Sequence, residues 1–212
     1  MLTIDKELEN LNQMLLKMAN IVQKNILDAF SAYQSGDQSV LINDDVVDQY
    51  ERLIEEVCLD IILKERLYAR DLRKVTGILR MVSDLERIGD HAEDIMEYHH
   101  NSRNENIAQY LGFSEILETA SSMVVDSILS FVNEDMELAR DVIIRDNIVD
   151  DGFQDLLKEL ITKIDNHEIP SSVAIYASIV LKYIERIADH AVNIAEWAVY
   201  IVNGYYKDRK IF

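Results

Sequence analysis

The chain has few residues that interrupt helices or cross-link the backbone. Its 212 residues include one proline, six glycines and one cysteine. Because proline and glycine break helices and favour turns, their scarcity favours long helices over a sheet-rich fold. The lone cysteine, Cys58, cannot form a disulfide within the chain or supply a cysteine-based metal site. We expect it to be a small buried side chain within the apolar run 57–63.

Positive charge and long apolar runs are also scarce. The formal net charge is −18, which disfavours binding to nucleic acid, because such affinity comes largely from neutralising phosphates. This charge suits metal cations or basic partner surfaces better. No run approaches the roughly 18 apolar residues of a membrane span, and the N-terminus lacks the apolar segment of a signal peptide. We therefore expect a cytoplasmic protein that associates with membranes only through partners.

One acidic motif occurs twice. The segment 83–95, SDLERIGDHAEDI, returns almost residue for residue as 183–194, YIERIADHAVNI, and 99 positions separate Glu86 from Glu185. At about 100° per residue, each copy places apolar residues on one side of a helix and carboxylates on the other. Each copy is predicted to be a core helix with an acidic outer edge.

Apolar residues recur at intervals of three and four along most of the chain, which predicts six helices. A polar, aperiodic segment at 101–109 is the expected linker, and Asp37 is the expected cap of the second helix. The fold is therefore predicted to be all-α, with two similar antiparallel three-helix bundles at residues 1–100 and 110–212. The expected helices are at about 7–33, 38–64, 69–100, 113–132, 135–164 and 170–203.

The second helix of each triplet also carries two carboxylates at positions i and i+4. Asp44 and Asp48 correspond to Asp146 and Asp150, with an offset of 102 residues. Counted from the expected caps, the first pair comes one helical turn earlier than the second. If consecutive helices are antiparallel neighbours, each half brings four carboxylates to one surface.

Carboxylates at this spacing repel each other by roughly 0.2–0.5 kcal/mol when uncompensated, so a source of positive charge is expected. One candidate is a set of ion pairs on a solvated face, Arg87 with Asp90 and Arg186 with Asp189. The other is a metal cation held between two helices. We favour the metal, because a solvated face has no reason to repeat at matched spacing on two helices of each half.

With these motifs assembled, the chain resembles the PhoU family of regulators of bacterial phosphate uptake. The most specific parts are ARDLRKV at 69–75, LERIGDHAEDI at 85–95 and IERIADHAVNIAEW at 184–197. The resemblance implies two three-helix bundles, no enzymatic activity, and homodimers. It also implies an adaptor function between a phosphate ABC transporter and a sensor histidine kinase, which restrains the phosphate-starvation response.

The resemblance further implies metal ions on the acidic motifs, of the iron, zinc, manganese or magnesium kind and in some members as multinuclear clusters. Each half would hold one site built from carboxylates of two helices. The first site would use Asp44, Asp48, Glu86 and Asp90, with Asp94. The second site would use Asp146, Asp150, Glu185 and Asp189, with Asn193.

The two halves differ in detail. Asp94 corresponds to Asn193, so a charged oxygen ligand in the first half faces a neutral one in the second. The two sites are therefore expected to differ in metal number or affinity. His91 and His190 repeat with the motif and are predicted to lie away from the core stripe. A ligand role and an ordinary surface position both stay open for them.

Two other functions remain as alternatives. A carboxylate-bridged multinuclear metal enzyme would use the same residue types, but the chain has no matched pair of E-x-x-H motifs of the di-iron kind and no evident nucleophile with its base. A purely structural helical protein is the other alternative. Stoichiometric metal on protein purified without chelator would count against it.

Overall fold

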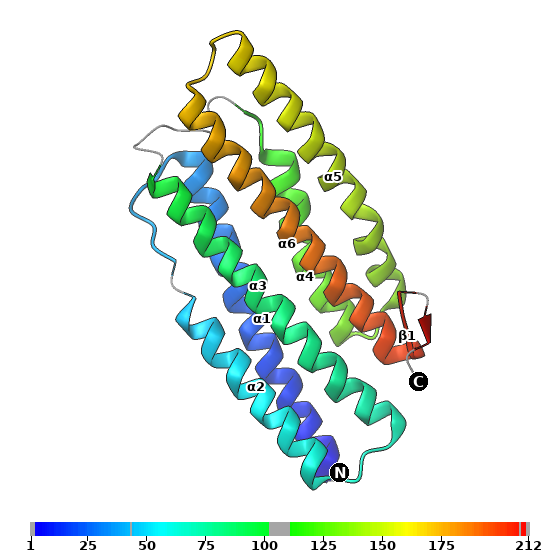
Figure 1. Ribbon diagram of the computed structural model, residues 1–212. Coiled ribbons are helices and arrows are strands. Elements are labelled where there is room, and N and C mark those ends of the chain that lie inside the picture. Colours follow the sequence, from blue (N-terminus) through cyan, green and yellow to red (C-terminus); the bar gives the residue numbers. More distant parts are fainter. Residues whose placement is uncertain (1–2, 43, 102–110, 208, 211–212) are drawn as a thin grey trace.

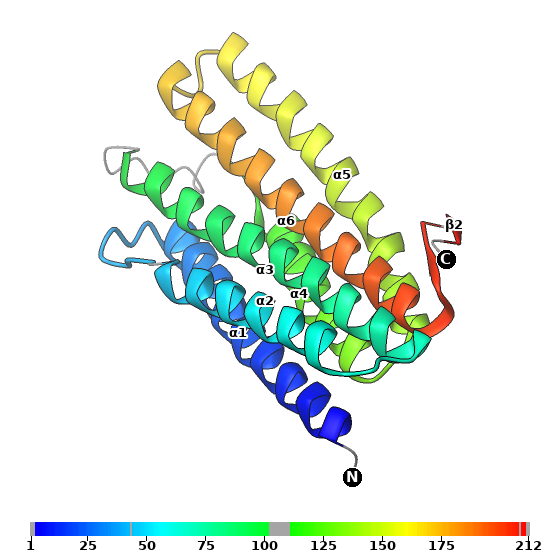
Figure 2. The same ribbon diagram turned by 60° about the horizontal axis from the view of Figure 1, so that its bottom comes forward.

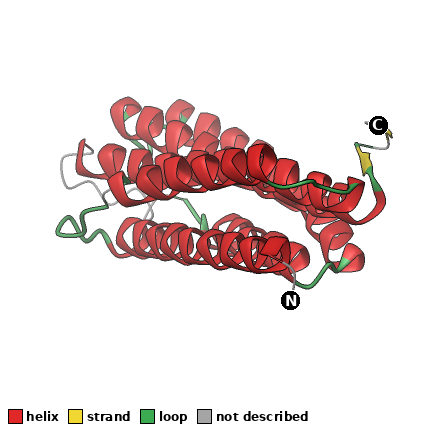
Figure 3. Cartoon of the chain, turned by 90° about the horizontal axis from the view of Figure 1, so that it is seen from below, coloured by secondary structure: helices red, strands yellow, loops and turns green. Residues whose placement is uncertain are grey.

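The computed structural model describes residues 3–42, 44–101, 111–207 and 209–210. Within these ranges six helices account for nearly all of the chain, as Figure 3 shows, so the all-α prediction with six helices is confirmed. Most of the expected linker, 101–109, lies outside the described residues. The helices are α1 (Thr3–Ser35), α2 (Asp45–Lys64), α3 (Ala69–Asn101), α4 (Ser114–Val132), α5 (Met136–Asp165) and α6 (Ser171–Asn203).

A small antiparallel hairpin follows α6. Its strands, β1 (Tyr205–Tyr206) and β2 (Arg209–Lys210), have only two residues each. The chain leaves α6 through Gly204, whose φ of 81° is a left-handed conformation that favours glycine. The sequence indicated the helix end at this glycine, but it did not predict the hairpin.

The six helices pack as two triplets, α1–α3 and α4–α6. The triplets meet mainly where α3 packs along α6, and α1 also contacts α4. Helices α2 and α5 lie on opposite outer sides of the molecule (Figures 1 and 2). Each of them covers a helix that carries one copy of the acidic motif, which places the carboxylates of α2 beside α3 and those of α5 beside α6.

The core is continuous across both triplets. Leu85 and Ile88 of α3 and Ile184 and Ile187 of α6 are fully buried, as the apolar stripes of the two copies predicted. Cys58 is also buried, and burial raises the pKa of its thiol to about 12. None of the described helices combines the length and the apolar character that a membrane span requires.

Helix α2 begins later than the sequence predicted. Residues 38–42 are not helical, and Asp44 rather than Asp37 is the N-cap. The reason is a local turn in which the Asp37 carboxylate accepts hydrogen bonds from the backbone N–H and the hydroxyl of Ser39, at 2.8 and 2.7 Å. Such side-chain bonds compete with helix formation. The first carboxylate pair therefore starts α2 instead of lying two turns inside it.

Helix α5 begins where the sequence predicted. Asp135 is its N-cap, and its carboxylate accepts hydrogen bonds from the backbone N–H groups of Glu137 and Leu138, both at 3.0 Å. These bonds satisfy donors that the first helical turn leaves without partners. As a result Asp146 lies well inside α5, whereas its counterpart Asp44 is the residue at which α2 begins.

Candidate metal centre

A compact group of carboxylates lies where the start of α2 meets the middle of α3. Asp44, Asp48 and Asp90 each direct one carboxylate oxygen to a common region, and these oxygens lie within 4.8 Å of one another. We call these three residues the acidic cluster. All three were predicted from the sequence to share a site. Three ionised carboxylates at this separation repel, and oxygen ligands of this kind suit hard or borderline cations.

Asp44 is the most unusual member of the acidic cluster. It is only 5% exposed, and neither of its carboxylate oxygens accepts a hydrogen bond from the described residues. Burial, with the adjacent Asp90 carboxylate adding to it, raises the pKa of Asp44 to about 8. A buried carboxylate without donors is unfavourable unless it is protonated, paired or bound to a metal. The residues present therefore fit a bound cation.

Gly89 of α3 allows this close approach. A Cβ added at this position would lie 2.4 Å from Oδ1 of Asp44 and 3.3 Å from Cγ1 of Val47. The first distance is shorter than real Cβ contacts, so any other residue would force Asp44 to move. In the other half the position 99 residues later is Ala188, which is buried and carries that methyl group. The two halves therefore differ at this repeat position, with a glycine in the first half and an alanine in the second.

Glu86 lies one helical turn before Asp90, next to the acidic cluster. Burial and the charge of Asp90 raise the pKa of Glu86 to about 7. Arg87 balances part of this charge, since its Nη1 is 2.9 Å from Oδ2 of Asp90 and its Nε is 3.4 Å from Oε2 of Glu86. The ion pair expected from the sequence thus exists, and it involves Asp90 itself, so Arg87 offsets part of the negative charge of the acidic cluster.

Two further glutamates add negative charge near the acidic cluster. The sequence analysis did not assign them to the site. Burial and then the charges of Glu55 and Asp48 raise the pKa of Glu51 on α2. Burial and then the charges of Asp45 and Asp90 raise the pKa of Glu93 on α3. Each lies three residues beyond a cluster aspartate and so is its neighbour on the helix surface, a spacing that the search for pairs four residues apart did not include.

The second half gathers its carboxylates more loosely. Burial and the charges of Asp150 and Asp189 raise the pKa of Asp146 to about 6, and burial and the charge of Glu185 raise the pKa of Asp189. In the described part of the chain, however, no three of these carboxylates meet within the distance seen in the acidic cluster. Figure 1 shows the two helices involved, α5 and α6, side by side.

The hydrogen bond of Asn193 and the ion pair of Asp94 lie outside the two groups of carboxylates. Oδ2 of Asp94 lies 3.5 Å from Nδ1 of His91 on its own helix, and its charge raises the pKa of Tyr183 on α6, although burial is the larger cause. Nδ2 of Asn193 donates a hydrogen bond to Oδ1 of Asp84 on α3, at 3.1 Å. Both side chains belong to the line of contact between α3 and α6, which we call the seam.

The repeated histidines also lie on the seam. The ring centroids of His91 and His190 are 5.7 Å apart, and Nδ1 of His190 donates to Oδ1 of Asp84 at 2.8 Å. His91 is only 8% exposed, so the prediction that it lies away from the core is wrong. The reason is that α6 covers this side of α3, a contact that the periodicity of one helix does not reveal.

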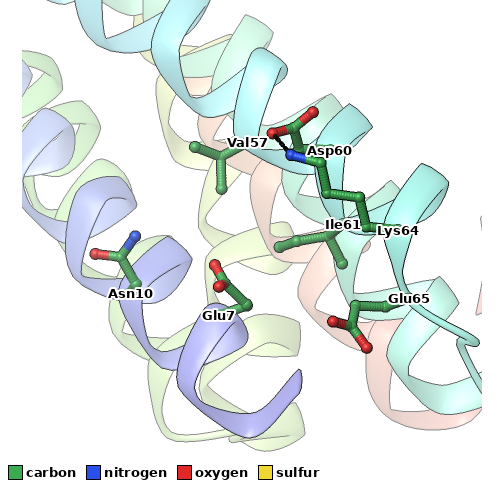
Figure 4. A pocket seen from close by; sticks show the side chains of 7 residues that line it. All are labelled: Glu7, Asn10, Val57, Asp60, Ile61, Lys64 and Glu65. Atoms are coloured by element: carbon green, nitrogen blue, oxygen red, sulfur yellow. Dashed lines mark hydrogen bonds and ion pairs between the residues drawn. The ribbon is translucent and has the colours of Figure 1, made fainter. Parts of the chain in front are cut away.

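A separate small pocket opens between α1 and α2 (Figure 4). Val57 and Ile61 supply apolar walls, and Lys64 pairs with Asp60 at its rim. Asp60 follows Asp44 by 16 residues along α2, which corresponds to about 24 Å of helix. This pocket is therefore distinct from the acidic cluster.

Known proteins with this architecture are clearly related to the chain. The family model described as the PhoU domain matches residues 15–98 and 113–198. Two proteins named phosphate-specific transport system accessory protein PhoU homolog are similar along most of their length. The one from Aquifex aeolicus is 37% identical, over 94% of this chain and 92% of its own length. The one from Pseudomonas putida is 34% identical, over 93% of this chain and 80% of its own length.

Solved structures agree with this. The crystal structure of PhoU from Pseudomonas aeruginosa has a TM-score of 0.88 at 32% identity and covers 96% of this chain and 100% of that chain. The crystal structure of the phosphate transport system regulatory protein PhoU from Streptococcus pneumoniae has a TM-score of 0.85 at 26% identity, with 98% and 100% covered. Two matches to the domain model, in the two halves of one six-helix fold, leave one conclusion: the chain belongs to the PhoU family.

Proposed function

We propose that the protein is a metal-binding regulator of phosphate transport that acts as an accessory protein of a phosphate-specific transport system. The names of its relatives support the transport role. The observation that carries the metal-binding part is the Asp44 carboxylate, which is buried without a hydrogen-bond donor beside Asp48 and Asp90.

In this proposal Asp44, Asp48 and Asp90 bind the metal ion directly. Glu86, one helical turn before Asp90 on α3, supplies a fourth carboxylate. A bound cation would neutralise carboxylates that otherwise repel one another across α2 and α3. Because every ligand is a carboxylate oxygen, magnesium, manganese and iron fit better than zinc, which favours nitrogen and sulfur ligands.

The second half would bind metal less tightly. Its ligands would be Asp146, Asp150, Glu185 and Asp189, which lie on α5 and α6 but converge less than the acidic cluster does. We propose residues 1–100 and 110–212 as the two repeat units, each with one such site. Asp94 and Asn193 are left out of the ligand sets because their contacts lie on the seam.

We further propose that the protein works in the cytoplasm as a homodimer and connects a phosphate ABC transporter to a sensor histidine kinase. Its role is that of an adaptor rather than an enzyme. The placement of His91 and His190 supports this, because both imidazoles point into the seam and neither is positioned as a general base for the acidic cluster.

The experiment that tests this function is deletion of the gene in cells grown with ample phosphate. We expect phosphate-starvation genes to become derepressed, and the native gene to restore repression. An Asp44→Asn gene should restore it poorly, whereas Asp60→Asn, which changes an exposed residue of the same helix, should restore it fully. Unchanged expression after deletion would contradict the regulatory role.

A further inference from the structure

A second polar site lies on the seam, outside the acidic cluster. It is a pocket between α3 and α6, lined by Arg80, Ser83 and Asp84 from the first half and by Asn193 and Trp197 from the second. The lining groups are a guanidinium, a hydroxyl, a carboxylate, an amide and an indole. This set differs in chemistry from the all-carboxylate groups described above.

The positive charge of Arg80 is available to a ligand. An aspartate at i+4 would ordinarily pair with it, but Asp84 is turned toward α6. There Oδ1 of Asp84 accepts hydrogen bonds from Nδ1 of His190 at 2.8 Å and from Nδ2 of Asn193 at 3.1 Å. Among the described residues, no carboxylate lies within 4.0 Å of the Arg80 guanidinium.

A second cation lies at the edge of the pocket. Nζ of Lys207, in the turn between β1 and β2, is 3.4 Å from Oδ1 of Asn193 and 3.2 Å from Oε2 of Glu196. Glu196 balances this lysine, and the donors from α6 are directed at the Asp84 carboxylate. Arg80 is therefore the one cation of this group without an ion pair among the described residues, although the Asp84 carboxylate of the same pocket offsets its charge at longer range.

The internal repeat provides a comparison within the molecule. Ile179 stands 99 residues after Arg80, and Asp94 stands 99 residues before Asn193. The corresponding part of the seam thus has an apolar residue in place of the guanidinium and a carboxylate in place of the amide. The combination of Arg80 and Asn193 therefore has no counterpart at the repeat-related positions, although the repeated histidines lie together on the seam.

We propose that this pocket binds a small oxyanion. The guanidinium of Arg80 would form two parallel hydrogen bonds to it, as arginine does with carboxylates and phosphates. The Ser83 hydroxyl would donate a further bond, and the indole of Trp197 would form the wall. The oxyanion would come either from free phosphate or from the carboxylate of an acidic side chain on a partner protein.

The chain carries its own reporter for this site, because Trp197 is its single tryptophan. The experiment is a titration of chelator-treated protein with inorganic phosphate and, separately, with acetate, at constant ionic strength maintained with chloride. Tryptophan fluorescence and isothermal titration calorimetry are recorded on the same samples. The use of metal-free protein makes the result independent of the proposed metal sites.

We expect saturable binding. Tighter binding of phosphate would identify free phosphate as the source, and tighter binding of acetate would identify a carboxylate. Arg80→Gln should weaken this binding by about tenfold or more, because it removes the charge-assisted bonds. Arg66→Gln removes the same charge at an exposed position outside the pocket and should leave the binding unchanged. The proposal is overturned if neither anion binds saturably, or if Arg80→Gln binds as tightly as the native protein.

Discussion

Gly89 of α3 and Asp44 at the start of α2 are in such close contact that a Cβ on the glycine would lie 2.4 Å from the aspartate carboxylate. This contact explains how a carboxylate becomes buried beside two others. In the other half Ala188 carries a methyl group at the equivalent position, and there the carboxylates are less tightly gathered.

Gly89→Ala should therefore weaken metal binding in the first half. The new methyl group would displace Asp44, and we expect the dissociation constant to rise by about tenfold or more, equivalent to roughly 1.4 kcal/mol. Gly112→Ala is the matched control, since a Cβ there meets nothing within 4 Å. Calorimetric titration of manganese into both metal-free variants measures the effect. Equal affinities for the two variants would show that the contact with Gly89 does not shape the site.

The stability of the metal-free protein should fall as the pH rises. The pKa of Asp44 is raised from 3.8 to about 8 in the folded protein. Between these values the folded state binds a proton that the unfolded state has released, so stability decreases with increasing pH. Glu86, with a pKa raised to about 7, acts in the same direction.

Thermal melting of chelated protein across this pH range measures the trend. Asp44→Asn should flatten the decline, because asparagine does not titrate. Added metal should reverse the decline, since it binds the ionised carboxylates. A melting temperature of the chelated native protein that rises from pH 5 to pH 8 would contradict the assigned environment of Asp44.

The double variant Glu185→Ala with Asp189→Ala should remove the metal of the second half and leave the helices formed. Each metal site adds about 2.7 kcal/mol to the free energy of unfolding when metal is at a hundredfold excess over the dissociation constant of that site. The double variant should lose the contribution of the second site and keep that of the first. Circular dichroism checks the helices, and elemental analysis counts the metal. A variant that keeps its full metal content would remove these residues from the ligand set.

Much of the fold could be predicted from the sequence because it depends on local spacing. The periodic apolar residues and the scarcity of glycine and proline were enough to indicate six helices. The helix ends at Asp135 and Gly204 followed ordinary capping chemistry. The start of α2 could not be predicted in this way, because the Asp37 side chain forms a local turn that the apolar pattern does not reveal.

The candidate site was partly predictable for the same reason. Spacing of four residues identified Asp44, Asp48 and Asp90, whose meeting requires only that α2 and α3 be neighbours. The positions of Asp94 and Asn193 depend instead on how α3 packs along α6, a contact between distant parts of the chain. The role of Gly89 could not be predicted, because the sequence around a single glycine in a helix does not show which residue packs against it.

Metal analysis of protein purified without chelator tests the central claim most directly. The native protein and Asp60→Asn, which alters an exposed residue of the same helix, should contain metal in stoichiometric amounts. Asp44→Asn should contain less metal and lack the stabilisation that metal gives. If the native protein holds no metal after dialysis against iron, manganese, magnesium and zinc, or if Asp44→Asn holds as much as the native protein, the acidic cluster is not a metal site.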